Sequence, residues 1–355
     1  MIVNHVTHGL LRLAVGPALF LFGLQSCGAP PPAASANSEA SMVASSARFS
    51  PSAAPSQGIA VIPAPRAGAA MAWDPKHGYL LMFGGADLAT QQVFADTWKW
   101  DGKDWTRLSP PVSPPGRSFG AMAFDPVGGT VLLYGGGVVM VDPPRHDTWA
   151  WDGTTWAELH PAEAPPPTFY SYRMVTDSAL PGVLLVGAAT NNLSLLSAWA
   201  WTGTTWRRVG SSASVPVRAQ FCMASESGSG VVLHGGFISE GEPGKVSDTW
   251  VWAGGNWLKR SSAGAAGGPC LMAYDQARRR IVMFVADQTW TYDSFSWTKR
   301  QPAHQPSKYL SFSAFAYDEA NQSVVLFGGK TDAVLGSPML SETWTWDGAD
   351  WSRRA

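Results

Sequence analysis

The chain has 355 residues, of which 45% are hydrophobic and only 14% are charged, a balance typical of proteins with a large buried core and few long solvated helices. The formal net charge is −1 and no basic or acidic run occurs, so nucleic acid and anionic membrane surfaces are excluded as electrostatic partners. The 18 Trp, 37 Gly and 27 Pro indicate an aromatic core interrupted by many turns.

The N-terminus predicts an export signal and a tether. The apolar run Leu13–Leu24 is too short to span a bilayer as a helix and is typical of a secretory signal. It ends in Leu24-Gln25-Ser26-Cys27, which resembles the lipobox of bacterial lipoproteins and implies lipid attachment at Cys27. Plain export without a lipid is the alternative. Residues 1–27 are therefore predicted to be a signal peptide with a lipobox, and residues 28–57, rich in Ala, Pro and Ser, a flexible tether.

From Arg66 to Trp351 one pattern recurs six times. A full copy has an acidic residue after a first apolar run, a Gly pair after a second, then Trp-x-Trp and a last Trp; in the fifth copy Tyr292 replaces the second Trp of Trp-x-Trp. In the first copy these are Asp74, Gly84-Gly85, Trp98-Lys99-Trp100 and Trp105. A period of roughly 50 residues with four short β-like runs is typical of propellers. We expect an all-β fold, a six-bladed β-propeller over residues 58–355, whose blades contain four antiparallel strands named a to d in chain order.

Alternation along strand c explains the Trp residues. Trp98 and Trp100 share one face of their strand and Lys99 lies on the other, so the aromatic face of one blade can pack on the small-residue face of its neighbour. Every Trp except Trp73 occupies such a repeat position, which favours a core role over carbohydrate stacking. Asp101-Gly102 between strands c and d predicts a type I′ hairpin turn.

The Gly pair after strand b and the aromatic residues of strands c and d resemble kelch repeats, the propeller type also found in the central domain of galactose oxidase. The resemblance covers residues from about 66 to 351. The third and fifth copies depart from it, with Gly187-Ala188 and Val285-Ala286 in place of the Gly pair, and the fifth has almost no b–c connection. A galactose oxidase copper site would require a Tyr cross-linked to Cys, whereas Cys222 and Cys270 fall in strand a, so no cofactor and no metal are expected.

The ligand face is predicted at the rim that carries the long b–c and d–a connections, since the a–b and c–d turns are tight. Long irregular loops gathered on one face are where propellers usually bind ligands. We expect a protein or glycan ligand there. The candidate ligand-binding residues are Arg145, His146, Tyr170, Tyr172, Asn191, Asn192, Lys308 and Lys330. The alternative is that these are ordinary solvated loop residues.

Three Arg residues could form either an anion site or structural ion pairs. Arg66, Arg117 and Arg218 occupy one repeat position, and the residue before Thr-Trp in strand c is an Asp in the same three copies. In the third and fifth copies both the Arg and the acid are missing. In the sixth copy the acid remains, as Glu342, although Leu310 stands at the Arg position and Lys308 two residues before it. Because the two residue types occur together and disappear together in the other five copies, structural ion pairs are favoured over anion capture. The acidic residues at the end of strand a likewise serve to close the a–b turns.

No catalytic constellation is found. The seven His residues show no metal-ligand spacing. Cys222 and Cys270 point to opposite faces of adjacent blades, a parity that permits a disulfide, but two buried thiols are expected. The prediction is a monomeric binding module in the bacterial cell envelope, periplasmic or surface-facing, that meets the membrane only through its lipid. The alternatives are a sugar-processing propeller enzyme of the sialidase or sialic acid epimerase type, which the kelch resemblance brings in, and a structural envelope component.

Overall fold

The computed structural model divides the chain into two compact units, Met1–Ser56 and Gln57–Ala355. The structure describes residues 62–354 except 138–143, 168–171, 178–181, 190–191, 213–214, 229, 239–243, 261–264, 307–311 and 332–337, and it does not describe the side chains at 189, 192–195 and 211–212. The predicted signal peptide, Cys27 and the tether lie outside the described residues.

The described residues of the second unit form six four-stranded antiparallel sheets, numbered here in chain order, in each of which strands a, b, c and d are adjacent in that order. The a strands are β1 (Ala70–Asp74), β7 (Ala121–Asp125), β11 (Arg173–Asp177), β16 (Cys222–Glu226), β22 (Cys270–Asp275) and β26 (Ala314–Asp318). The b strands are β2 (Tyr79–Phe83), β8 (Thr130–Tyr134), β12 (Gly182–Ala189), β17 (Gly230–His234), β23 (Arg280–Val285) and β27 (Ser323–Phe327). The c strands are β5 (Thr97–Trp100), β9 (Thr148–Trp151), β13 (Asn192–Trp201), β20 (Thr249–Ala253), β24 (Gln288–Tyr292) and β28 (Thr343–Trp346). The d strands are β6 (Trp105–Leu108), β10 (Trp156–Leu159), β14 (Trp206–Ser212), β21 (Asn256–Arg260), β25 (Trp297–Lys299) and β29 (Trp351–Arg354).

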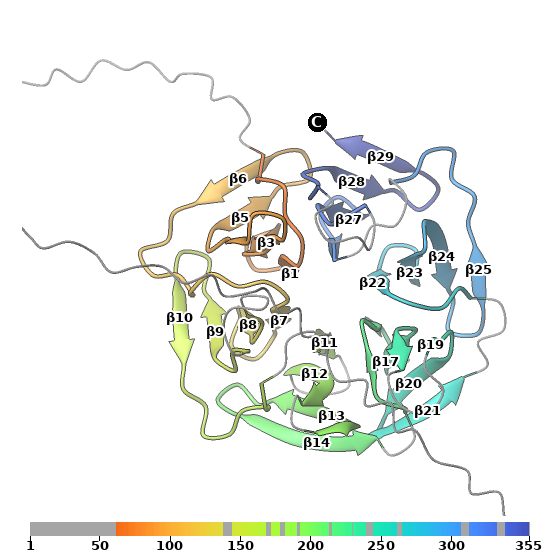
Figure 1. The fold of residues 1–355 in the computed structure, drawn as a ribbon, viewed down its shortest axis with the longest axis horizontal. Helices are drawn as coiled ribbons and strands as arrows, with labels where there is room; N and C mark the ends of the chain where they lie inside the picture. The colour runs from red at the N-terminus through yellow and green to blue at the C-terminus, as the bar shows by residue number, and fades with distance from the viewer. Residues whose placement is uncertain are drawn as a thin grey trace, which may run out of the picture. The chain divides into compact units, whose positions relative to one another are not determined.

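The six sheets stand in a ring with the a strands innermost and the d strands at the circumference (Figure 1). Two small sheets lie in the connections: one within the b–c connection of sheet one, and one that pairs the d–a connection before sheet four with the b–c connection of sheet four. One pairs β3 (Ala86–Asp87) with β4 (Gln92–Val93), and the other joins β15 (Arg218–Ala219), β18 (Phe237–Ile238) and β19 (Gly244–Lys245). The prediction of an all-β propeller is confirmed.

The core lies between the sheets. Each hydrophobic cluster joins the Trp-bearing face of one sheet to the small-residue face of the sheet before it. Between sheets one and two, for example, Trp149, Trp151 and Trp156 pack with Ala70 and Ala72. The same arrangement closes the ring, because Trp98, Trp100 and Trp105 of sheet one pack with sheet six. The predicted role of the Trp residues as core between blades is therefore correct.

A hydrogen bond that the sequence analysis missed links neighbouring sheets. The indole Nε1 of Trp156 in strand d donates to the hydroxyl of Thr97 in strand c of the preceding sheet, at 3.0 Å. Equivalent Trp-to-Thr bonds of 2.8–3.0 Å occur at four other sheet boundaries. At the remaining boundary the acceptor position is Ala198 and the Trp is Trp257. The Thr of the recurring Thr-Trp sequence in strand c thus satisfies a buried indole of the next sheet.

The tight turns follow the prediction in part. Asp74 accepts hydrogen bonds from the backbone N–H groups of Lys76 and His77 and closes its a–b turn as expected. The c–d turn of sheet one differs from type I′: it has four residues, of which only Gly102 has a positive φ. Asp101 closes it by accepting the N–H groups of Lys103 and Asp104 at 2.9 and 2.8 Å. A side-chain acceptor therefore replaces the second left-handed residue.

The b–c connections also differ between sheets. In sheet five, β23 and β24 are joined by Ala286 and Asp287 alone, both with positive φ, as the short predicted connection requires. In sheet three the expected irregular loop is largely absent, because β12 and β13 extend and pair as far as Ala189 and Asn192. The Gly pair of sheet one behaves as predicted, since a Cβ on Gly84 would clash with the carbonyl oxygen of Arg117.

The described residues contain no helix, and so none of sufficient length and apolar character to cross a membrane.

Candidate functional site

A central cavity opens where the a strands begin, which is the end of the ring that carries the b–c and d–a connections. Its volume is about 170 Å³, and residues from all six sheets line it. The predicted ligand face and this cavity are thus at the same end of the propeller. The cavity lies on the ring axis, however, and its described lining comes from the starts of the a strands and from the residues just before them.

The side chains that line the cavity are mainly apolar, although about half of the cavity surface is polar. One repeat position, the second or third residue of strand a, contributes a thioether in five sheets: Met71, Met122, Met174, Met223 and Met272. Sheet six has Phe315 at the equivalent position. The five Met side chains are buried, and their unbranched, polarisable thioethers can adapt to the shape of an apolar group.

An aromatic pair stands at the mouth. The rings of Phe119 and Phe312 meet edge to face with centroids 5.1 Å apart, and both residues line the cavity. Gly68 lies between them in the ring of sheets: its N–H donates to the carbonyl of Phe312 and its carbonyl accepts the N–H of Phe119, each at 2.7 Å. A Cβ on Gly68 would be 3.0 Å from the Phe119 ring, so glycine permits the two rings to meet.

Three residues at this repeat position have a left-handed backbone although they are not glycine. They are Phe119 (φ 60°), Gln220 (φ 57°) and Phe312 (φ 62°). A left-handed conformation costs a non-glycine residue roughly 1–2 kcal/mol. The fold therefore places two aromatic rings and one amide at the cavity mouth at a cost in backbone energy.

Arg173 is the charged residue of the described lining. Its repeat position is Ala70, Ala121, Cys222, Leu271 or Ala314 in the other sheets, so the cation is a departure from the repeat. The guanidinium donates to the carbonyl of Tyr172 at 3.0 Å and lies over the ring of Phe221 at 5.8 Å. No carboxylate pairs with it in the part of the chain that the structure describes. Burial lowers the pKa of Arg173 to about 10, which still leaves it protonated at neutral pH.

Cys222 and Cys270 form a disulfide, so the expectation of two free thiols is wrong. Cys222 occupies the same repeat position as Arg173, and Cys270 the same position as Phe221. The residue aligned with Ala70 in one sheet therefore contacts the residue aligned with Ala69 in the next sheet. This inter-sheet register brings Arg173 to Phe221 and Cys222 to Cys270, and both cysteines line the cavity.

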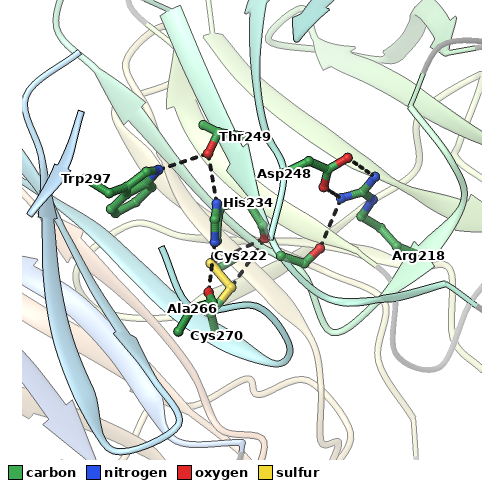
Figure 2. Close-up of a disulfide and its surroundings, with 9 residues drawn as sticks. Arg218, Cys222, His234, Asp248, Thr249, Ala266, Cys270 and Trp297 are labelled. Carbon is green, nitrogen blue, oxygen red and sulfur yellow. Dashed lines mark hydrogen bonds and ion pairs between the residues drawn. A yellow bond between two sulfur atoms is a disulfide. The ribbon is translucent and has the colours of Figure 1, made fainter. Parts of the chain in front are cut away.

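A buried histidine lies next to the disulfide (Figure 2). The sulfurs of Cys222 and Cys270 lie 3.6 and 3.3 Å from the carbonyl oxygen of His234. The His234 ring contacts the carbonyl oxygen of Ala266 through Nε2 at 3.1 Å and the Thr249 hydroxyl through Nδ1 at 2.9 Å. Since a carbonyl can only accept, Nε2 carries the proton. Burial lowers the pKa of His234, so the ring is neutral and its role is structural.

The three repeat arginines form ion pairs, as predicted. Arg66 binds Asp96 through two hydrogen bonds of 2.6 and 2.9 Å, and Arg117 binds Asp147 in the same way at 2.6 and 2.7 Å. Arg218 pairs with Asp248, as Figure 2 shows. Burial alone raises the pKa of each carboxyl, but the Arg and a Trp indole outweigh it and hold the pKa below its ordinary value. These cations are therefore committed to the fold.

The predicted ligand-binding residues differ in where the structure places them. Tyr170, Asn191 and Lys308 lie outside the described residues, as does the side chain of Asn192, whose backbone is in β13. His146 is exposed and Arg145 is half-buried. Lys330 and Tyr172 are buried, whereas both ligand-binding loops and solvated loops would expose them. Lys330 is buried, with its backbone bridged to Met339. Tyr172 lines the cavity, but it is buried and its hydroxyl donates to the carbonyl of Pro166 at 2.8 Å.

A second hollow, of about 430 Å³, lies at the other end of the ring, between sheets four and five. Its lining includes Glu226, Arg260, Tyr292 and Phe295. The hydroxyl of Ser294 bonds to Glu226, and Phe295 is 85% exposed at the tip of a c–d turn. Phe295 therefore provides a control position away from the central cavity.

Among the described residues, no group of three or more His, Cys, Asp or Glu side chains is placed to hold a metal ion.

No protein-family model and no curated protein matches the sequence. Among solved structures, the chain is similar to the structure of YjhT, with a TM-score of 0.59 and 14% sequence identity over 83% of this chain and 99% of that chain. A likeness at this level of identity establishes the propeller fold and carries no residue role from one protein to the other.

Proposed function

We propose that this chain is an exported, lipid-anchored propeller of the kelch type that binds a protein or carbohydrate ligand at the end of the ring bearing the b–c and d–a connections. The observation that carries the proposal is the central cavity at that end. Apolar side chains from six sheets surround one cation there, and the described lining contains no Asp, Glu or His to serve in acid–base chemistry. Such a lining suits binding better than catalysis.

The disulfide supports export. Cys222 and Cys270 are linked, and disulfides persist in oxidising compartments, whereas cytosolic proteins are kept reduced. Together with the apolar run before Cys27 and the Ala/Pro/Ser-rich segment after it, this favours a domain held at the cell envelope by a lipid. Substituting Cys27→Ala is expected to release the protein from the membrane fraction and to abolish globomycin-sensitive processing. Unchanged membrane association would contradict the anchor.

The binding role is tested with glycan and peptide arrays probed with the purified protein. Ala69 is half-buried in the cavity wall, so Ala69→Phe is expected to fill the cavity and abolish the array signals. Phe295→Ala, at the other end of the ring, is the matched control and should leave them unchanged. Signals that survive Ala69→Phe would place binding elsewhere, and an array without signals would favour a structural envelope component.

A further inference from the structure

The cation in the central cavity has the features of a ligand-binding group. The other buried arginines, Arg66, Arg117 and Arg218, each have a carboxylate partner, whereas Arg173 has a backbone carbonyl and an aromatic ring. Holding a guanidinium in a partly buried place without a carboxylate costs stability. In five of the six sheets the repeat has an uncharged residue at this position. The fold does not need the charge of Arg173.

Gln220 adds an uncommitted amide beside this cation. It lines the cavity, it precedes Phe221, over which Arg173 lies, and its side chain makes no hydrogen bond with the described residues. Its backbone is left-handed, with a φ of 57°. Arg173 and Gln220 together offer several N–H donors and no negative charge, which suits a carboxylate.

Most of the remaining side chains in the lining are apolar. They include the five Met side chains, Leu271, Pro269 and the aromatic pair of Phe119 and Phe312. The hydroxyl groups of Tyr172 and Ser313 already donate hydrogen bonds to backbone carbonyl oxygens. A neutral sugar would cover the Arg173 cation without supplying a counter-charge, whereas a carboxylate supplies one. The volume of about 170 Å³ slightly exceeds the roughly 150 Å³ of an apolar cavity that holds benzene. One six-membered ring therefore fits.

Resting on the binding function proposed above, we infer that the central cavity binds a carboxylate carried on a compact apolar ring. Arg173 is the anion-binding residue, Gln220 supplies a second hydrogen-bond donor, and Phe119 and Phe312 pack against the ring. The same chemistry occurs in a free aromatic acid and at the C-terminus of a peptide that ends in an aromatic residue.

The test measures binding of benzoate and of benzamide, its neutral analogue, by titration calorimetry with the purified protein. Benzoate is expected to bind with one-to-one stoichiometry, and benzamide is expected to bind at least about tenfold more weakly than benzoate. Arg173→Gln should weaken benzoate at least about tenfold and change benzamide far less, because the cation that attracts the carboxylate is lost while an amide donor is kept. Ala69→Phe should abolish both, and Phe295→Ala neither. N-acetyl-L-phenylalanine, compared with benzoate, separates a peptide terminus from a free acid as the source.

The urea unfolding midpoint distinguishes a ligand-binding role for Arg173 from a structural one. An unpaired cation kept for a ligand predicts that Arg173→Gln leaves the urea midpoint unchanged or higher, whereas Arg117→Gln, which breaks an ion pair, lowers it. Equal binding of benzoate and benzamide, D-glucuronate binding more tightly than benzoate, or a lower urea midpoint for Arg173→Gln would each overturn the inference. Array signals blocked by Ala69→Phe would in that case still support the binding function itself.

Discussion

Loss of the Cys222–Cys270 disulfide is expected to destabilise the propeller strongly. The cysteines are 48 residues apart, and a cross-link closing a loop of that length stabilises the folded state by about 4 kcal/mol in the chain-entropy description. For a domain of this size that corresponds to a fall of roughly 8 °C in the melting temperature. The bond joins sheet four to sheet five, and sheet five lacks the Arg–acid pair, with Gly267 and Gln288 at those positions.

The assay is urea unfolding followed by Trp fluorescence, with and without dithiothreitol, for the protein and for the double variant Cys222→Ala/Cys270→Ala. Reduction should lower the unfolding midpoint of the protein to that of the double variant, and it should not affect the variant. In a Cys27→Ala background, a thiol reagent should label no cysteine of the unfolded, unreduced chain. An unreduced midpoint equal to the reduced one, or two labelled cysteines, would refute the reasoning.

Three further predictions concern the contacts between and within sheets. Arg117→Met leaves the Asp147 carboxylate with the Trp149 indole as its side-chain donor and removes the Arg117 donor from two carbonyl oxygens, and should cost about 3–5 kcal/mol in urea unfolding. The third copy has Phe169 and Ser197 at these two positions. Arg117→Phe with Asp147→Ser reproduces that residue pair and should recover most of the lost stability. No recovery would contradict a replaceable structural pair. Thr97→Val removes the acceptor of the Trp156 indole and should cost about 1–2 kcal/mol, with Thr97→Ser as the control that retains the hydroxyl. The three Arg-paired aspartates have lowered pKa values in the folded state, so their stabilisation is complete above about pH 4 and is lost as pH falls through those values. Urea midpoints measured from pH 6 to pH 2 check this, and a midpoint independent of pH below 4 would contradict it.

The repeat in the sequence was sufficient to predict the sheets, their strand order and the role of the Trp residues. This was possible because each repeat places the same residue type at the same position, and alternation along a strand fixes which face it occupies. The Arg–Asp pairs could be predicted for the same reason, since both partners belong to one repeat and occur together. Turn details such as the acceptor role of Asp101 depend on a local competition between side chain and backbone, and the Asp-Gly signal alone did not resolve it.

The candidate site could not be predicted in this way, because it is formed between repeats. From the sequence, the ligand-binding residues were predicted to lie in loops, with Tyr172 among them. In the structure the Tyr172 side chain is buried at a sheet boundary. Aligning Arg173 with Ala70 and Ala121 would have shown that it departs from the repeat. Its meaning depended on knowing that this position faces the next sheet and the ring axis, which is also what brings Cys222 to Cys270. By itself, the sequence determined the fold of each sheet, since those contacts are local and periodic. Only the tertiary structure decided which residues meet around the axis, because the offset between neighbouring sheets is set by how their faces pack.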